Sequence, residues 1–253
     1  MDESQKNLLD FTNENDTLDG FQGIDNDTMA IPFVRVLQPG SPQAKKEEKT
    51  FIEGAEPGLF LNTVTKKLYK AITVIVLQFE HIILEWKPRA TGGGLVGRHT
   101  YEYGMKLATD TTQFGKWKTR DGNELQENYV YAALVCGEEK NGIVCLSFPS
   151  TFIKTAKEWN RLLVTHIISE GKLKGQRAKP FYLKWDISTE YVSKPPYSWY
   201  IPKVRFAGYI DQLQYGVVEP ERKALPSLKI DFAQLEATPE DEKGADISAE
   251  TKF

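Results

Sequence analysis

The stretch Ile72–Trp86, with the sequence ITVIVLQFEHIILEW, decides which fold this chain can adopt. Apolar residues occupy odd and even positions alike and β-branched side chains dominate, which predicts one long strand covered on both faces. One face is expected to carry Ile75, Leu77, Phe79 and Ile83, and the other Ile72, Val74, Val76, Ile82, Leu84 and Trp86. Gln78, Glu80 and His81 interrupt the run, which indicates a bulge or bend and excludes a membrane span. Such a strand is typical of the centre of a closed or strongly curled sheet.

The segment that follows, KPRATGGGLVGRH (Lys87–His99), combines positive charge with flexibility. Lys87, Arg89 and Arg98 flank three consecutive glycines, and glycine leaves the backbone conformationally free. A Walker phosphate loop would need Gly-x4-Gly-Lys-Ser/Thr, which this segment lacks. The segment therefore predicts a flexible hairpin tip on a surface that binds something anionic.

The rest of the chain predicts short strands and one clear helix. Strands are expected over Ala30–Gln38, Gly58–Asn62, Leu68–Tyr69, His99–Met105, Phe114–Thr119, Tyr129–Cys136, Ile143–Phe148, Phe181–Tyr191 and Tyr197–Tyr209. The helix is expected from Phe152 to Ile167, where apolar residues recur at helical spacing. Its other face carries Lys154, Lys157 and Arg161, and Lys172, Lys174, Arg177 and Lys179 follow. These elements indicate a β-rich α+β chain, a β-barrel or sandwich with additions.

Charge is distributed unevenly along the 253 residues, although the net charge is only −3. Residues 1–28 hold eight acids and one lysine, residues 65–120 and 150–210 are basic, and residues 211–253 are acidic again. We predict a disordered acidic arm over 1–28, one nucleic-acid-binding domain over 29–235 and a disordered acidic tail over 236–253. A basic body between acidic ends is typical of nucleic-acid binders, although the alternative is that oppositely charged segments pair on folding.

Few groups in the chain predict catalysis. The three histidines are scattered and Cys136 and Cys145 lack zinc-site spacing, so neither a metal nor another cofactor is expected. Glu85 and Lys87 have the Glu-x-Lys spacing of some metal-dependent nucleases, which leaves a nuclease as a weak alternative to a non-enzymatic protein. The acidic first thirty residues lack the apolar region of a signal peptide. Two cysteines cannot form a disulfide framework, so the protein is expected in the reducing environment of the cytoplasm.

Aromatic and basic side chains alternate on several expected strands, an arrangement that suits single-stranded nucleic acid. Cations contact the phosphates there, and aromatic rings stack on bases for about 1–3 kcal/mol each. Phosphate contacts are expected from Lys87, Arg89, Arg98, Lys116, Lys118, Lys203 and Arg205, and stacking from Trp86, Tyr101, Trp117 and Trp199. For each single ring, the alternative is a place in the core. Trp199, Lys203 and Arg205 are expected to share one face of their strand.

The acidic tail ends in an aromatic residue, and in this it resembles the tails of bacterial and phage single-stranded DNA-binding proteins. The tail residues concerned are Asp241, Glu242, Asp246, Glu250 and Phe253. In those families the tail docks replication or recombination proteins and competes with DNA for the basic groove. A barrel followed by an acidic tail also resembles the phage type, which implies an OB-like β-barrel with additions. The stretches IPFVRVLQPGSP, EPGLFLNTVTKKLY and EWKPRATGGGLVGRH look like a protein that recurs in phages and prophages.

We therefore expect a non-enzymatic protein of phage type that binds single-stranded DNA during replication or recombination. Binding is expected to depend little on sequence and strongly on salt. No membrane association is expected, and homo-oligomer formation and strand annealing stay open. The alternative class is a phage structural or protein-interaction domain without DNA binding, and the weaker alternative is a nuclease around Glu85 and Lys87.

Overall fold

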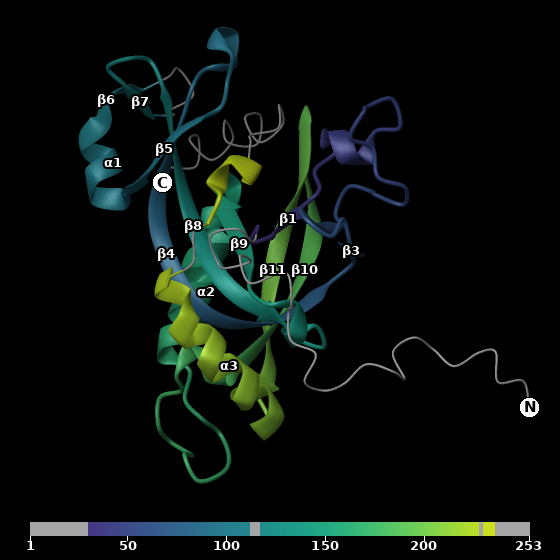
Figure 1. Cartoon of the computed structure of the whole chain (residues 1–253), viewed down its shortest axis with the longest axis vertical. Helices are drawn as coiled ribbons and strands as arrows, with labels where there is room; N and C mark the ends of the chain where they lie inside the picture. Colours follow the sequence, from purple (N-terminus) through teal and green to yellow (C-terminus); the bar gives the residue numbers. More distant parts are fainter. Residues whose placement is uncertain (1–29, 112–116, 228–229, 236–253) are drawn as a thin grey trace, which may run out of the picture.

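The computed structural model describes residues 30–111, 117–227 and 230–235, and these form one curled mixed sheet with three α-helices (Figure 1). The predicted arms over 1–28 and 236–253 lie outside the described residues. The strands are β1 (Phe33–Val36), β2 (Phe60–Asn62), β3 (Leu68–Tyr69), β4 (Ile72–Trp86), β5 (Leu95–Thr100), β6 (Ala108–Thr111), β7 (Trp117–Thr119), β8 (Glu124–Val135), β9 (Val144–Pro149), β10 (Leu183–Lys194) and β11 (Tyr197–Tyr209). The helices are α1 (Tyr101–Leu107), α2 (Ile153–Thr165) and α3 (Gln212–Ala224). None of the helices among the described residues has the length and apolarity needed to cross a bilayer.

The sheet has eleven strands and is mostly antiparallel. Its main path runs β11-β10-β4-β8-β9-β1-β2-β3, while β5 pairs with β4, and β6 and β7 extend from β8. Only the β1–β9 pair is parallel among the described strands. The predicted β-rich class is confirmed, with a sheet curled into a half-barrel.

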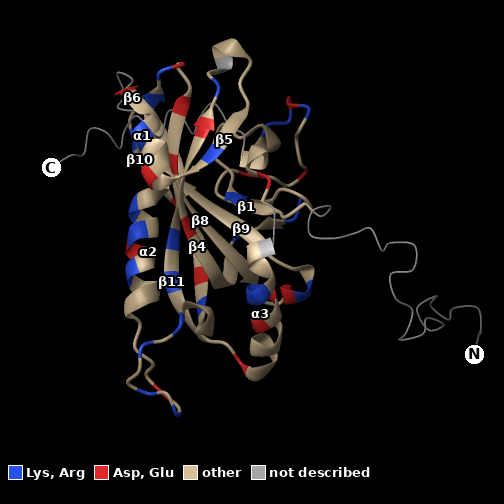
Figure 2. Cartoon of the chain, turned by 60° about the vertical axis from the view of Figure 1, so that its left-hand side comes forward, with Lys and Arg blue, Asp and Glu red and all other residues tan. Residues whose placement is uncertain are grey.

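The long strand β4 has the predicted bounds. Both of its ends are buried on both faces, as expected, but Gln78 and Phe79 in its middle are exposed. One hydrophobic cluster joins side chains from both ends of the strand order, such as Val34 of β1 and Ile187 of β10, so the sheet curls around it. This first core also takes in Trp159 of α2. A second core lies on the other face of the sheet and includes Val218 of α3. Figure 2 shows α2 and α3 on opposite sides of the sheet.

A bulge in β4 changes which side chains share a face. The pairing with β8 shifts register between Val76 and Gln78, where the polar interruption predicted an irregularity. An extra residue in one strand reverses the alternation beyond it. Ile82, Leu84 and Trp86 therefore join Ile75 and Leu77 in the second core, while Ile72, Val74 and Val76 belong to the first. The expected division of faces is correct before the bulge and wrong after it.

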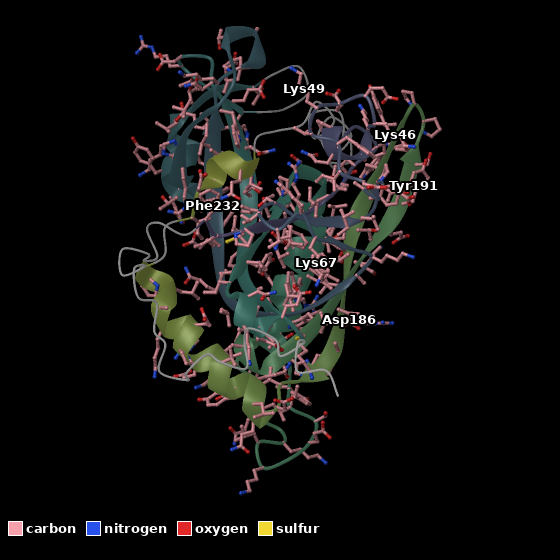
Figure 3. All side chains as sticks on the ribbon, turned by 45° about the vertical axis from the view of Figure 1, so that its right-hand side comes forward. Lys46, Lys49, Lys67, Asp186, Tyr191 and Phe232 are labelled. Carbon is pink, nitrogen blue, oxygen red and sulfur yellow. The ribbon has the colours of Figure 1, made fainter. Side chains whose placement is uncertain are left out.

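The two ends of the curled sheet meet through side chains instead of a strand ladder. The amide group of Gln38 exchanges two hydrogen bonds with the backbone of Tyr200, each 2.9 Å long. The hydroxyl of Thr189 donates to the carbonyl oxygen of Gly58 at 2.6 Å, and a Cβ on Gly58 would overlap the ring of Tyr200. In Figure 3 the β10–β11 hairpin, which carries Tyr191, rises beside the loop between β1 and β2. These contacts hold the half-barrel partly closed.

Two helices differ from the prediction. The expected strand over His99–Met105 ends at Thr100, whose side chain caps α1 by accepting a hydrogen bond from the Tyr103 backbone N–H. Gly104 lets α1 lie directly against Ile83, because a Cβ there would overlap that side chain. No helix was predicted where α3 lies, and α3 contains Pro220, a residue that is disfavoured inside helices.

Candidate nucleic-acid interface

The glycine-rich loop does not gather the side chains predicted around it. Trp86 is only 7% exposed and belongs to the second core, so its predicted role in stacking on bases is wrong. The Arg98 guanidinium pairs with the Glu80 carboxylate and lies over the ring of Phe232, 5.4 Å from its centroid. Lys87 is exposed. The side chain of Arg89 and all of Lys116 lie outside the described residues.

The other predicted residues of this region have different surroundings. Tyr101 lies on α1 and stacks on the ring of His81 with 4.0 Å between centroids. Trp117 lies opposite Leu125 of β8, and Lys118 lies opposite Glu124, so these neighbours point to opposite faces of the sheet. Both are half-buried. The structure therefore places Tyr101 on α1, and Trp117 and Lys118 on opposite faces of β7.

The Glu85 carboxylate, proposed for the nuclease alternative, is engaged in a structural network. It is buried, one oxygen lies 2.8 Å from Nε2 of His99, and the other accepts a hydrogen bond from the Asn123 side chain at 2.6 Å. The network ties β4 to β5 and to the turn before β8. Among the residues that the structure describes, no group of three His, Cys, Asp or Glu side chains could hold a metal ion.

The hairpin residues Trp199, Lys203 and Arg205 share one face of β11, as the strand alternation predicted. Their positive charges are matched by acids on β10. Lys203 pairs with Glu190 at 2.6 Å, and Arg205 lies 3.6 Å from Asp186. Trp199 is half-buried, and its indole N–H has no partner among the described residues. The site predicted there is therefore close to electrically neutral.

A second set of cations gathers on α2 and the segment that follows it. We call this set the α2 basic surface: Lys154, Lys157, Arg161, Lys172, Lys174, Arg177 and Lys179. Between residues 153 and 179 the only acids are Glu158 and Glu170. All seven cations are exposed, and none lies within ion-pair distance of a carboxylate in the described residues. Figure 2 shows this positive charge along the outer side of α2 and in the loop below it.

Packing under α2 holds this surface in place. Ala156, Trp159 and Leu163 bury one side of the helix against the first core, so the cations on its other side face solvent. The loop beyond α2 is closed by backbone hydrogen bonds, including one of 2.9 Å from the Ala178 N–H to the His166 carbonyl oxygen. The pattern of the helix predicted these cations as its polar face. The sequence did not identify these cations as a binding site, because it does not show which cations of the chain form ion pairs with acids.

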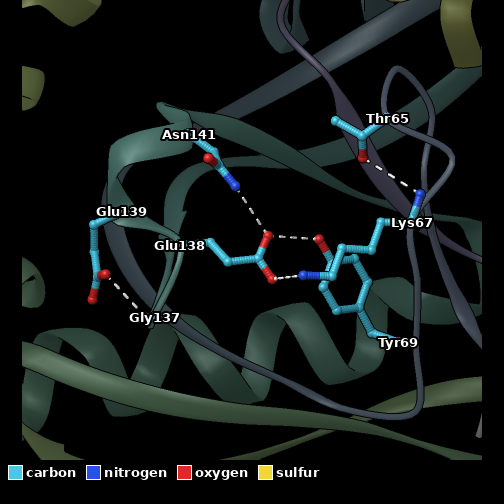
Figure 4. Close-up of polar contacts among 7 residues, drawn as sticks. All are labelled: Thr65, Lys67, Tyr69, Gly137, Glu138, Glu139 and Asn141. Carbon is cyan, nitrogen blue, oxygen red and sulfur yellow. Dashed lines mark hydrogen bonds and ion pairs between the residues drawn. The ribbon is translucent and has the colours of Figure 1, made fainter. Parts of the chain in front are cut away.

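The Glu138 carboxylate, in the turn between β8 and β9, is held by three side chains (Figure 4). It pairs with the Lys67 ammonium at 2.5 Å and accepts a hydrogen bond of 3.0 Å from the Tyr69 hydroxyl. Partial burial disfavours the charged carboxylate, but the bonds from Lys67 and Tyr69 outweigh it and lower the pKa of Glu138. Burial and the bond to Glu138 raise the pKa of Tyr69 to about 12. This network fastens β3 to the β8–β9 turn.

Replacing Glu138 with glutamine is expected to lower the free energy of unfolding at pH 7 by about 1 kcal/mol. A carboxyl whose pKa is lowered on folding stabilises above its unfolded pKa and loses this effect as pH falls through the folded pKa. The difference between wild type and Glu138→Gln should therefore shrink below pH 4. Urea unfolding at several pH values measures it, with Glu158→Gln, an exposed acid on α2, as the comparison. A difference that grows on acidification would contradict the assignment.

The two cysteines are not reactive groups. Burial raises the pKa of Cys136 to about 11 and that of Cys145 to about 12, so both stay protonated thiols at neutral pH. Cys145 belongs to the second core and Cys136 packs against it. Neither thiol contributes to a binding surface.

Comparison with known proteins gives a match that spans most of the chain. The family model described as Pam3 phage gp34-like protein matches residues 2–227. No curated protein and no solved structure matches.

Proposed function

The chain belongs to the Pam3 phage gp34-like protein family, and from this premise we propose that it is a phage protein that binds single-stranded DNA. In this proposal it has no enzymatic activity, binds largely independently of sequence, and acts in DNA replication or recombination in the host cytoplasm. The curled sheet is then an elaborated OB-like barrel, a fold that binds single strands through basic and aromatic side chains. The α2 basic surface carries the proposal, because its seven cations have no ion-pair partner in the described residues.

Two exposed rings close to α2 favour a single strand over a duplex: Phe79 lines a cavity with residues of α2, and Phe206 contacts His166 at the end of the helix. Phe79 of β4 is 38% exposed and Phe206 of β11 is 37% exposed. The bases of a single strand can turn out and lie on such rings, whereas the paired bases of a duplex remain stacked on one another. A duplex would therefore contact the cations without the rings. The combination of cations and accessible rings supports single-stranded DNA as the ligand.

The acidic tail has a second role in this proposal. Residues 236–253 hold six acids against two lysines, and the docking residues are Asp241, Glu242, Asp246, Glu250 and Phe253. A tethered polyanion has a high effective concentration at a cationic surface of its own chain. The tail therefore competes with DNA for the α2 basic surface. When DNA displaces it, the tail is free to dock replication or recombination proteins.

Fluorescence anisotropy of a labelled oligothymidylate of about thirty nucleotides, titrated with the full chain across salt concentrations, tests the proposed function. The logarithm of the affinity is expected to fall linearly with the logarithm of salt. About 0.7 counterions are released per phosphate contacted, so the slope should reach at most about −5 for a seven-cation surface. A duplex of equal length should bind more weakly. If the oligothymidylate does not bind at about 50 mM salt, even to a chain without residues 236–253, the interaction-protein alternative is favoured instead.

Removing residues 236–253 is expected to tighten the binding of the same oligonucleotide at low salt, because the competing polyanion is gone. The matched comparison keeps the tail and replaces Asp241, Glu242, Asp246 and Glu250 with their amides. Both variants should approach the same higher affinity, and the difference from the full chain should disappear at high salt. An unchanged affinity at low salt in both variants would rule out competition by the tail.

A further inference from the structure

A cavity of about 400 Å³ lies between α2 and the middle of β4. Side chains that line it include Val76, Phe79, Asn160, Arg161, Val164 and Pro180. Its volume is within the range of about 300–1,000 Å³ that small-molecule sites occupy. Apolar groups make up most of the lining, while Asn160 and Arg161 add polar ones. The cavity is therefore large enough for a flat ring system and has polar groups that can orient it.

The cavity exists because one edge of β4 lacks a strand partner at this point. On that edge β10 pairs with Ile72–Ile75 and β5 pairs with Ile82–Trp86. No strand of the described chain pairs with residues 76–81 between them on that edge. The bulge between Val76 and Gln78 falls inside this gap. The cavity is thus an opening built into the sheet.

Phe79 presents a fixed aromatic ring to this opening. Its ring meets Tyr129 edge-on, with 5.4 Å between centroids, and tilts against Tyr131 at 5.2 Å. These two contacts hold the ring in place, while 38% of the residue remains exposed. Val164 of α2, another lining residue, is 55% exposed and so stands at the mouth. A ring that is fixed and accessible is a ready stacking partner for another planar group.

Two polar residues connect the cavity to the charged surface around it. Arg161 lines the cavity and is also one of the seven cations of the α2 basic surface. The Asn160 side-chain oxygen accepts a hydrogen bond of 2.9 Å from the Tyr131 hydroxyl, which fixes the amide, and the amide N–H groups have no acceptor among the described residues. A phosphate near Arg161 and a base carbonyl near Asn160 would each accept hydrogen bonds from the neighbouring side chain. The charge of the surroundings therefore favours a polyanion that carries planar groups.

We propose that this cavity receives one unstacked base of the bound single strand, with Phe79 as its stacking ring and Arg161 on a neighbouring phosphate. The inference rests on the proposed function and adds a position at which the strand is anchored. It also predicts that the bases themselves, besides the charged backbone, contribute to affinity at this point.

Two oligonucleotides of equal length and charge test the inference, one an oligothymidylate and the other the same backbone without bases. Wild type is expected to prefer the oligothymidylate, and the base in the cavity should account for about five- to 150-fold of this preference, the equivalent of stacking one base. Val164→Trp places a bulky ring at the mouth of the cavity and should remove most of that share while leaving the affinity for the base-free strand unchanged. Leu162→Trp is the matched control, since Leu162 lies on the same helix, is 45% exposed and does not line the cavity.

Phe79→Leu is a second variant that does not fill the cavity and should also reduce the preference for bases. A preference that stays at the wild-type value in both Val164→Trp and Phe79→Leu would overturn the inference, as would a wild type without preference. Failure of the proposed function gives a different result, because neither oligonucleotide would then bind wild type at low salt.

Discussion

Replacing Lys154, Lys157 and Arg161 together with glutamine is expected to weaken the binding of single-stranded DNA by about ten- to hundredfold at low salt. These three cations stand on the outer side of α2, and no described carboxylate neutralises them. Each can therefore contact a phosphate without first losing an ion pair. Removing three phosphate contacts should also make the slope of log affinity against log salt shallower by about 2. Anisotropy titrations of a labelled oligothymidylate at several salt concentrations measure both quantities.

The matched control changes the same number of charges elsewhere. Lys45, Lys46 and Lys49 are exposed in the loop between β1 and β2, which lies beside the β10–β11 hairpin (Figure 3). Replacing them with glutamine alters the net charge equally and should reduce affinity only slightly, through the long-range field. Equal losses in the two triple variants would show that net charge, and not the α2 basic surface, determines binding.

The elements that were predictable from the sequence are those that carry their own local pattern. The apolar run of β4 and the helical spacing of α2 each indicate one structure, and both were located within one or two residues. The division of β4 between two cores was not predictable beyond Val76. The polar residues after Leu77 indicated a bulge or bend, but Leu77 is apolar like its neighbours, so the pattern did not show which residue is added. The parallel pairing of β1 with β9 was not predictable either, because the two strands are far apart in the sequence.

The short helices show how local signals can conflict. Tyr101 and Tyr103 fit strand alternation, while the Thr100 cap and the close contact of Gly104 favour a helix, and only the packing on Ile83 decides between them. For α3 a signal was present, since Asp211 and Gln214 form a capping box. Pro220 lies inside this helix, although proline usually ends or kinks a helix.

The sequence predicted that basic and aromatic side chains form the candidate site. It did not show which of them are exposed and without an ion-pair partner in the described residues. Lys203 and Arg205 are balanced by acids that the antiparallel register brings across from β10, and no spacing along the chain reveals such pairs. Trp86 is the last residue of β4, and its ring packs in the second core. The cations on α2 have no ion-pair partner in the described part of the chain, because no described strand beside that helix face supplies acids.

Replacing Trp159 with alanine is expected to lower the free energy of unfolding by about 3–5 kcal/mol, the largest effect of a single substitution that we foresee. Trp159 is 1% exposed, and its ring lies 4.3 Å from Tyr131 and 6.2 Å from Trp185 between centroids. Alanine would leave a cavity at the point where α2 meets the first core, and the rigid rings around it could not fill the space. For a chain of this length the midpoint of thermal unfolding should fall by about 6–20 °C, measurable by circular dichroism.

Leu162→Ala is the matched control for this substitution, because Leu162 lies on the same helix and is 45% exposed. It should change the midpoint by little, since surface substitutions are worth about 0.5 kcal/mol or less. A small loss in Trp159→Ala would mean that α2 contributes little to the fold. The triple variant of Lys154, Lys157 and Arg161 should show the opposite behaviour, with an unchanged or higher midpoint, because those side chains make no buried contact and repel one another. Stability and DNA binding thus depend on opposite faces of α2, so each can be reduced without the other.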